Sequence, residues 1–210
     1  MGRIVVSEFV SLDGVMEDPG GSEGTRHAAW TFRFDRGAEG DRFKLDEVRD
    51  AEALLLGRVT YEGFAAAWPA IDDPDGFADR MNGMPKYVVS TTLADADATW
   101  NNSSVVRGDV VAEVRRLKEE LEGDLLVAGS ASLVRLLAEN GLVDEYRMMM
   151  FPIALGSGKR LFEDVAEPAV LALDSSRVVG DGIVILTYHA ATVVAPAESQ
   201  PDRKKREDEP

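Results

Sequence analysis

Ala53-Leu54-Leu55-Leu56-Gly57-Arg58-Val59-Thr60-Tyr61-Glu62 is the stretch that decides the fold. Its consecutive apolar residues are typical of a strand that is covered on both faces. Gly57 allows a sharp turn or the close approach of a ligand, and a helix pattern follows directly. Free N–H groups at a helix start, together with Arg58 and Thr60, suit a phosphate group. An ordinary strand-to-helix corner with a surface arginine is the alternative.

Asp124-Leu125-Leu126-Val127-Ala128-Gly129-Ser130-Ala131-Ser132-Leu133 forms a second corner of the same kind. A buried strand again ends at a glycine, and Ser130 is a good N-cap for the helix that follows. The pair of corners therefore predicts two anion-binding helix starts in one sheet. Neither corner contains the Gly-x-Gly-x-x-Gly fingerprint or the P-loop lysine, so neither of those motifs is present.

The remaining chain predicts an α/β fold in which strands and helices alternate. Asp181 lies between two glycines and gives a strong hairpin signal near the C-terminus. The predicted strands cover residues 3–12, 53–57, 86–93, 101–106, 124–128, 144–154, 169–179 and 182–193. The predicted helices cover residues 41–51, 59–68, 109–121 and 130–139, with a short helical turn at 77–81.

Composition limits the function. The chain has 210 residues, no cysteine, two histidines and a formal net charge of −15. The acidic charge argues against nucleic acid and anionic membranes as partners. Without cysteine there is no disulfide or thiolate site, and two histidines cannot form a three-histidine metal site, so we expect no metal. No apolar run is long enough for a membrane span and no export signal is visible, which predicts a cytoplasmic protein.

We expect one domain over residues 1–195, because no second core or repeat is visible. Residues 196–210 are polar and charged without apolar periodicity, which predicts a disordered tail.

Three further segments each allow a structural and a functional interpretation. Asp13 and Gly14 either form a tight turn or belong to a loop that closes over a ligand with Met16 as an apolar contact. The aromatic group around Trp30 either packs in the core or lines a pocket for a planar ligand. The hydroxyls of residues 90–92 either begin a turn or bind phosphate oxygens.

Five sequence blocks, in this order, make residues 3–193 resemble the dihydrofolate reductase-like proteins, which include the C-terminal reductase domain of bacterial riboflavin biosynthesis. The blocks are Val10-Ser11-Leu12-Asp13-Gly14-Val15, Leu55-Leu56-Gly57-Arg58-Val59-Thr60-Tyr61, Tyr87-Val88-Val89-Ser90-Thr91-Thr92-Leu93, Val127-Ala128-Gly129-Ser130-Ala131-Ser132 and Pro152-Ile153-Ala154-Leu155-Gly156-Ser157-Gly158-Lys159-Arg160-Leu161-Phe162. The resemblance implies a three-layer fold, with a mostly parallel sheet of about eight strands, flanking helices and a C-terminal antiparallel hairpin.

The resemblance also implies an NADPH-dependent reductase that acts on a small planar ring, pterin-like or pyrimidine-like, and that forms a homodimer. By resemblance, the cofactor-binding residues are Leu12, Asp13, Gly14, Gly57, Arg58, Thr60, Ser90, Thr91, Thr92, Gly129, Ser130, Ala131 and Ser132. Met16 and Trp30 are the expected substrate contacts. Folate reductases place a carboxylate on the helix before the strand that ends at Gly57, and Asp41 has a plausible spacing for it, although Asp46 and Glu47 are also nearby and the Met-Pro-Trp segment of those enzymes is missing here. Asp41 is otherwise a solvated carboxylate in the first turn of the helix. The alternative is a non-catalytic nucleotide-binding or interaction protein that retains the fold.

Overall fold

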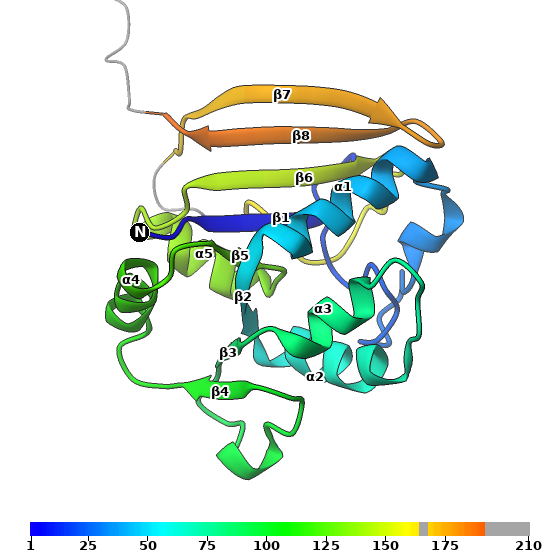
Figure 1. The fold of residues 1–210 in the computed structure, drawn as a ribbon. Coiled ribbons are helices and arrows are strands. Elements are labelled where there is room, and N and C mark those ends of the chain that lie inside the picture. Colours follow the sequence, from blue (N-terminus) through cyan, green and yellow to red (C-terminus); the bar gives the residue numbers. More distant parts are fainter. Residues whose placement is uncertain (164–167, 192–210) are drawn as a thin grey trace, which may run out of the picture.

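The computed structural model describes residues 1–163 and 168–191, which form a three-layer α/β fold around one eight-stranded sheet (Figure 1). The strands are β1 (Ile4–Ser11), β2 (Ala51–Gly57), β3 (Lys86–Val89), β4 (Ser103–Val106), β5 (Asp124–Val127), β6 (Glu145–Phe151), β7 (Leu171–Val179) and β8 (Ile183–Ala190). The α-helices are α1 (Gly37–Asp50), α2 (Arg58–Ala67), α3 (Phe77–Gly83), α4 (Val110–Glu120) and α5 (Ala131–Glu139), and the 3-10 helices are η1 (Trp30–Arg33), η2 (Trp68–Ala70) and η3 (Asp95–Asp97).

The sheet order is β4-β3-β2-β5-β1-β6-β8-β7. The first six strands in this order are parallel, and β8 and β7 continue the sheet in antiparallel pairing. The carboxyl ends of the parallel strands therefore meet at one edge, where open α/β sheets bind ligands. The predicted fold class, including the C-terminal hairpin, is confirmed.

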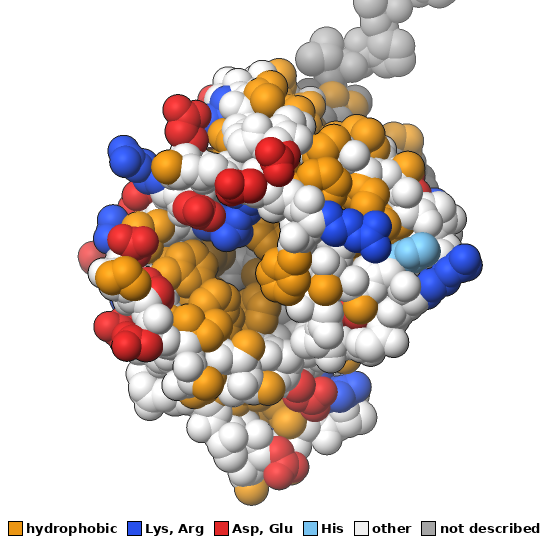
Figure 2. Space-filling view, turned by 90° about the vertical axis from the view of Figure 1, so that its right-hand side faces the viewer, with side chains coloured by type: hydrophobic (Ala, Val, Ile, Leu, Met, Phe, Trp, Pro, Cys, Tyr) orange, Lys and Arg blue, Asp and Glu red, His pale blue; other side chains and the backbone are white. Residues whose placement is uncertain are grey.

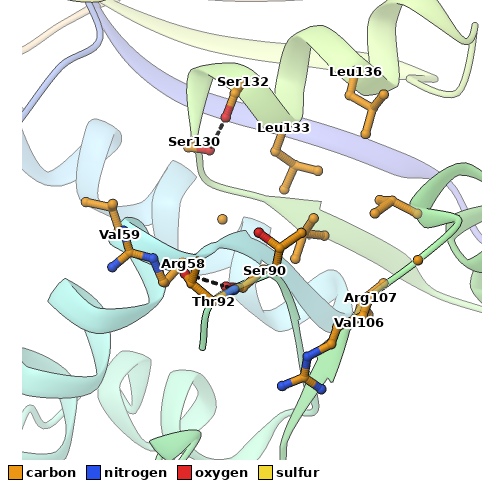
Figure 3. A pocket seen from close by; sticks show the side chains of 15 residues that line it. Arg58, Val59, Ser90, Thr92, Val106, Arg107, Ser130, Ser132, Leu133 and Leu136 are labelled. Carbon is orange, nitrogen blue, oxygen red and sulfur yellow. Dashed lines mark hydrogen bonds between the residues drawn. The ribbon is translucent and has the colours of Figure 1, made fainter. Parts of the chain in front are cut away.

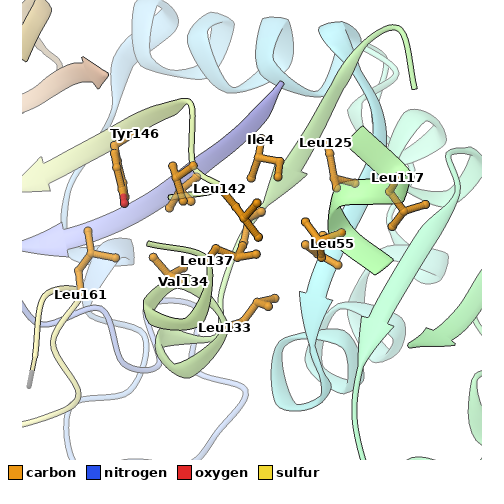
Figure 4. Packing of buried hydrophobic residues seen from close by; sticks show 14 of the residues in the cluster. Ile4, Leu55, Leu117, Leu125, Leu133, Val134, Leu137, Leu142, Tyr146 and Leu161 are labelled. Atoms are coloured by element: carbon orange, nitrogen blue, oxygen red, sulfur yellow. The ribbon is translucent and has the colours of Figure 1, made fainter. Parts of the chain in front are cut away.

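Helices cover both faces of the parallel sheet, so the central strands are buried on both sides and carry apolar side chains on both faces. On one face, alternate residues of β1 and β5 pack against α4 and α5 in a cluster that includes Leu117, Leu133 and Leu137 (Figure 4). On the other face, Leu54 and Leu56 of β2 pack with residues of α1, α2 and α3.

The turn between β7 and β8 is hydrogen-bonded to the segment before α1. Gly180 has φ +47°, and a Cβ there would lie 2.0 Å from the carbonyl oxygen of Asp35, so only glycine fits. The Asp181 N–H donates to the same Asp35 carbonyl at 2.8 Å, and the Asp181 carboxylate accepts from the Asp35 N–H at 2.8 Å. The last hairpin therefore holds the start of α1 in place.

Several boundaries differ from the predictions. α1 begins at Gly37, one turn before the predicted start, because Gly37 with φ +64° ends the preceding loop. β3 ends at Val89, which leaves the hydroxyl residues 90–92 in the following loop. The predicted tail and the end of the last strand lie outside the described residues. None of the helices in residues 1–163 and 168–191 combines the length and the apolar character needed to cross a bilayer.

Candidate dinucleotide-binding site

The two glycine corners lie side by side. The Gly57 N–H donates to the Gly129 carbonyl at 3.1 Å. A Cβ at Gly57 would lie 2.4 Å from the Ser130 hydroxyl oxygen and 3.0 Å from the Ser130 nitrogen. Gly129 has φ +90°, and a Cβ there would lie 2.8 Å from the Thr60 hydroxyl oxygen. Both corners therefore require glycine, one because of close packing and the other also because of its backbone conformation.

The helix that leaves each corner has no side-chain cap. Gly57 is the N-cap of α2, and Ser130 is the N-cap of α5. The Ser130 hydroxyl lies 3.0 Å from the Ser132 hydroxyl and does not cap a backbone amide. By contrast, the Asp109 carboxylate at the start of α4 accepts from the Ala112 N–H at 3.0 Å. Uncapped helix starts leave N–H groups and the positive end of the helix dipole for an anion.

Both corners open into a groove of about 580 Å³ at the carboxyl edge of the sheet (Figure 3). Figure 3 shows Ser130 and Ser132 at the start of α5 on one side, with Arg58, Ser90 and Arg107 on the other. The lining residues are Gly57, Arg58, Val59, Val89, Ser90, Thr91, Thr92, Val106, Arg107, Gly108, Val110, Ser130, Ser132, Leu133 and Leu136. The groove combines apolar walls with hydroxyls and two guanidinium groups.

Seven of the residues expected at the cofactor line this groove: Gly57, Arg58, Ser90, Thr91, Thr92, Ser130 and Ser132. Thr60 and Gly129 lie next to each other behind the groove, and Ala131 is also outside its lining. Leu12, Asp13 and Gly14 belong to a different part of the carboxyl edge, after β1.

Arg107 is a groove residue that the sequence analysis missed. It follows the edge strand β4, and its guanidinium reaches Asp95 at 2.8 Å. Arg58 pairs in the same way with Glu62 at 2.8 Å. Because exposed ion pairs of this kind contribute little to stability, Arg58 can exchange its carboxylate for a phosphate at small cost, whereas Arg107 also donates to the Leu93 carbonyl. The groove thus has two guanidinium groups beside it in a chain whose net charge is strongly negative.

Asp13 has a structural role that its turn position did not reveal. Its carboxylate accepts from the Ser11 hydroxyl at 2.7 Å and from the backbone N–H groups of Leu155 and Gly156 at 3.0 and 2.7 Å. These hydrogen bonds lower the pKa of Asp13 to about 2. Asp13 is therefore ionised at neutral pH, and its hydrogen bonds connect the loop after β1 to the loop after β6.

Trp30 and Met16, which we expect as substrate contacts, both have buried side chains in the structure. Trp30 is 0% exposed, packs edge-to-face on Phe151 at 5.3 Å and donates its indole N–H to the Glu17 carbonyl at 2.9 Å. The exposed large apolar residues include Leu12 at 62% and Phe32 at 77%. The core interpretation of Trp30 is therefore correct, and Phe32 is the exposed aromatic residue of that segment.

Asp41 does not face the sheet. Its side chain is 60% exposed and forms an ion pair at 2.9 Å with Arg36, just before its own helix. The α1 carboxylate that does face the sheet is Glu47, which is buried and neutralised by Lys44 at 2.5 Å while accepting from the Ser7 hydroxyl at 3.0 Å. The position of Asp41 therefore gives no support to a catalytic role.

Glu8 in the middle of β1 is a second group that the sequence analysis missed. It is 7% exposed, and its Oε1 atom has no hydrogen-bond partner. Burial raises the pKa of Glu8 to about 8, although Lys44 and the Gly129 backbone amide act in the opposite direction. Buried acids with such shifts are candidates for functional groups. Within the described residues, no cluster of three His, Asp or Glu side chains is arranged to hold a metal ion.

Comparison with known proteins agrees with this fold. Residues 3–185 match the RibD C-terminal domain family, so the chain belongs to that family. It is 29% identical over 190 residues to the uncharacterized protein YyaP of Bacillus subtilis, covering 89% of this chain and 94% of YyaP.

Two solved structures share the fold. The "putative riboflavin biosynthesis protein" of Shewanella sp. PV-4 superposes with a TM-score of 0.73 at 22% identity, covering 90% of this chain and 99% of that one. Dihydrofolate reductase from Enterococcus faecalis, solved with NADP(H), superposes with a TM-score of 0.53 at 16% identity, covering 90% and 97%. These similarities confirm the predicted dihydrofolate reductase-like fold.

Proposed function

We propose that this protein is a reductase that uses NADPH to reduce a small planar ring, pterin-like or pyrimidine-like. The groove is the observation that carries the proposal, because it joins two uncapped helix starts with two guanidinium groups and a row of hydroxyls. That combination suits a ligand with separate phosphate groups. The Enterococcus faecalis enzyme of the same fold was solved with NADP(H), which supports this choice.

In this proposal the diphosphate lies at the starts of α2 and α5. The 2′-phosphate lies near Arg58 and Arg107, where the hydroxyls of residues 90–92 add short donors. Guanidinium groups suit phosphate oxygens because they donate in pairs. Arg107 would thus help to select NADPH over NADH.

The substrate would bind in the hollow of the carboxyl edge. Figure 2 looks onto the right-hand side of Figure 1, where β1 and β6 end, and shows a hollow with largely hydrophobic walls and charged side chains around it. Such walls suit a flat ring. We assign the apolar contacts to Leu12 and Phe32, which are large exposed apolar side chains in the segment between β1 and α1.

NADPH supplies the hydride when it is bound. The chain itself would bind and orient the two ligands and keep water from the reacting atoms. Of the α1 carboxylates, Asp41 is exposed and paired with Arg36, and Glu47 is buried and paired with Lys44, so neither has the position of an evident proton donor.

The placement of Asp41 and Glu47 favours a second candidate function. A protein that binds the dinucleotide without turnover also needs the groove but needs no acid near the substrate. NADPH oxidation, followed as loss of absorbance at 340 nm with a panel of pterins, pyrimidines and quinones, separates the two. Oxidation with any member removes the second candidate, whereas binding without oxidation favours it.

Calorimetric titration with NADPH and NADH tests the groove itself. We expect Arg107→Gln to weaken NADPH binding by about tenfold or more, because charge-assisted hydrogen bonds contribute about 1.5–3 kcal/mol each, and to change NADH binding little. Arg115→Gln on the exposed side of α4 removes the same charge away from the groove and is the matched control. The proposal fails if millimolar NADPH produces no heat and no thermal shift.

We include a homodimer and a cytoplasmic location in this proposal. The methionine-rich segment at 148–151 does not supply the dimer contact, because β6 lies between β1 and β8 and Met148, Met149 and Phe151 are buried there. Light scattering that gives twice the chain mass of 22.8 kDa would support the dimer, and a monomer mass would exclude it.

A further inference from the structure

Glu8 of β1 lies close to the Gly129–Ser130 corner of the groove. Side chains of a strand alternate between the two faces of the sheet. Ile4, Val6 and Val10 of β1 belong to the cluster under α4 and α5. Glu8 occupies the same set of alternate positions, so its side chain points to that face. Val6 pairs with Val127 of β5. Two residues further along β1, Glu8 is level with Gly129, which lies two residues past the end of β5 and whose backbone amide is near enough to affect the ionisation of Glu8.

The carboxyl group of Glu8 has no counter-ion of its own. The charges that act on it are Lys44 and Glu47, both from α1, and Lys44 is already bonded to Glu47 and to the Ser7 hydroxyl. Tyr146 of β6 faces the same cluster and is neutral, because burial raises its pKa to about 12. The residues of β5 at this level are apolar, and the start of α5 carries only hydroxyls.

An ionised Glu8 would affect the corner in two ways. It would place a negative charge, without a cation of its own, behind the helix start that the diphosphate needs. It would also strengthen the attraction between the carboxylate and the nearby Gly129 amide, which belongs to the same corner. A protonated Glu8 does not repel the diphosphate, and it attracts the Gly129 amide less strongly, because charged acceptors make the stronger hydrogen bonds.

We propose that Glu8 is a positioning residue of the dinucleotide site, whose carboxyl group must carry a proton when a phosphate occupies the Gly129–Ser130 corner. The inference rests on the proposed function and adds to it a proton that is bound together with the cofactor. Such coupling follows from linkage, since the anion binds only the protonated fraction of the protein.

The expected pH dependence is large. With a pKa of about 8 in the free protein, the protonated fraction falls about 25-fold between pH 7.5 and 9.5. The dissociation constant of NADPH should rise by about the same factor. Phosphate monoesters have a second pKa near 6, so the 2′-phosphate does not titrate in this window. NADH should show the same slope, because it shares the diphosphate.

Calorimetry on the full-length chain at pH 7.5, 8.5 and 9.5, in two buffers of different ionisation enthalpy, measures both affinity and proton uptake. We expect the wild type to take up close to one proton when it binds NADPH at pH 9.5. Glu8→Gln should bind NADPH with the same affinity at every pH. Glu119→Gln, on the exposed surface of α4, removes one charge elsewhere and should keep the wild-type slope.

Dinucleotide binding by the wild type with no pH slope and no proton uptake would overturn this inference and leave the proposed function intact. Retention of the slope in Glu8→Gln would overturn it as well. If neither dinucleotide binds the wild type at any pH, the proposed function fails, and this inference fails with it. The proton count on the wild type decides the question even if the variant does not fold.

Discussion

Gly57→Ala tests whether the two corners touch. Gly57 has φ −73° and ψ 157°, which alanine adopts without strain, so any cost comes from packing alone. The new Cβ would lie 2.4 Å from the Ser130 Oγ, 2.9 Å from its Cβ and 3.0 Å from its backbone nitrogen. Carbon atoms pack favourably at about 3.5–4.0 Å, so the corners must separate by roughly half an ångström or more.

Overpacking of this kind costs about 1–3 kcal/mol, and we expect the upper part of that range because one of the clashing atoms is backbone. For a chain of this size 1 kcal/mol lowers the melting temperature by roughly 2–4 °C. Gly57→Ala should therefore melt roughly 4–12 °C below the wild type, and NADPH should restore less stability to it than to the wild type, because the groove is distorted.

Thermal and urea unfolding measure the effect. Gly20→Ala is the control, because no atom lies within 4 Å of the Cβ it would introduce. Ser130→Gly removes two of the three clashing atoms, so the double variant should recover about 1 kcal/mol relative to additivity. If Gly57→Ala is as stable as Gly20→Ala, the corners are not in contact and the groove has been described incorrectly.

Four other substitutions test the surrounding structure. Asp13→Asn should destabilise the fold by about 1 kcal/mol at pH 7 through lost hydrogen bonds to the loop at 155–156. Because the folded-state pKa of Asp13 is about 2, its contribution is present above pH 4 and is lost as the pH falls toward 2, so the difference in unfolding free energy should shrink over that range. Lys86→Met should cost about 3 kcal/mol in urea unfolding, because the buried ammonium group donates to three backbone carbonyls at 2.8–2.9 Å, and an unchanged urea midpoint would contradict this. Trp30→Ala should cost about 3–5 kcal/mol whereas Phe32→Ala should stay within about 0.5 kcal/mol, and comparable losses would show that the two burials are assigned wrongly.

Local patterns were sufficient to predict the main elements of the fold. A run of apolar residues that ends at glycine and leads into a helix pattern predicted both corners, and the structure brings Gly57 and Gly129 into contact. The Gly-Asp-Gly turn predicted the last hairpin. These features depend on a few neighbouring residues, which is why sequence alone could identify them.

The missed residues depend on contacts between distant segments. Arg107 lines the groove because β4 pairs with β3, and no local pattern gives that pairing. Trp30 and Phe32 lie two residues apart, and only the packing of η1 against Phe151 decides which of them is buried. Glu8 did leave a signal, because a glutamate between Val6 and Val10 interrupts the apolar positions on that face of the strand.

The sheet order also governs how the chain can assemble. β2 and β3 can pair soon after both have been synthesised. β1 pairs only with β5 and β6, so the pairing of Ile4 with Leu125 cannot form until β5 has been synthesised. Until then β1 has two unpaired edges, which are open to wrong partners on another nascent chain. Long-range pairing of this kind slows folding. A chain stopped before residue 124 would hold β2, β3 and β4 together and leave β1 without a place in the sheet.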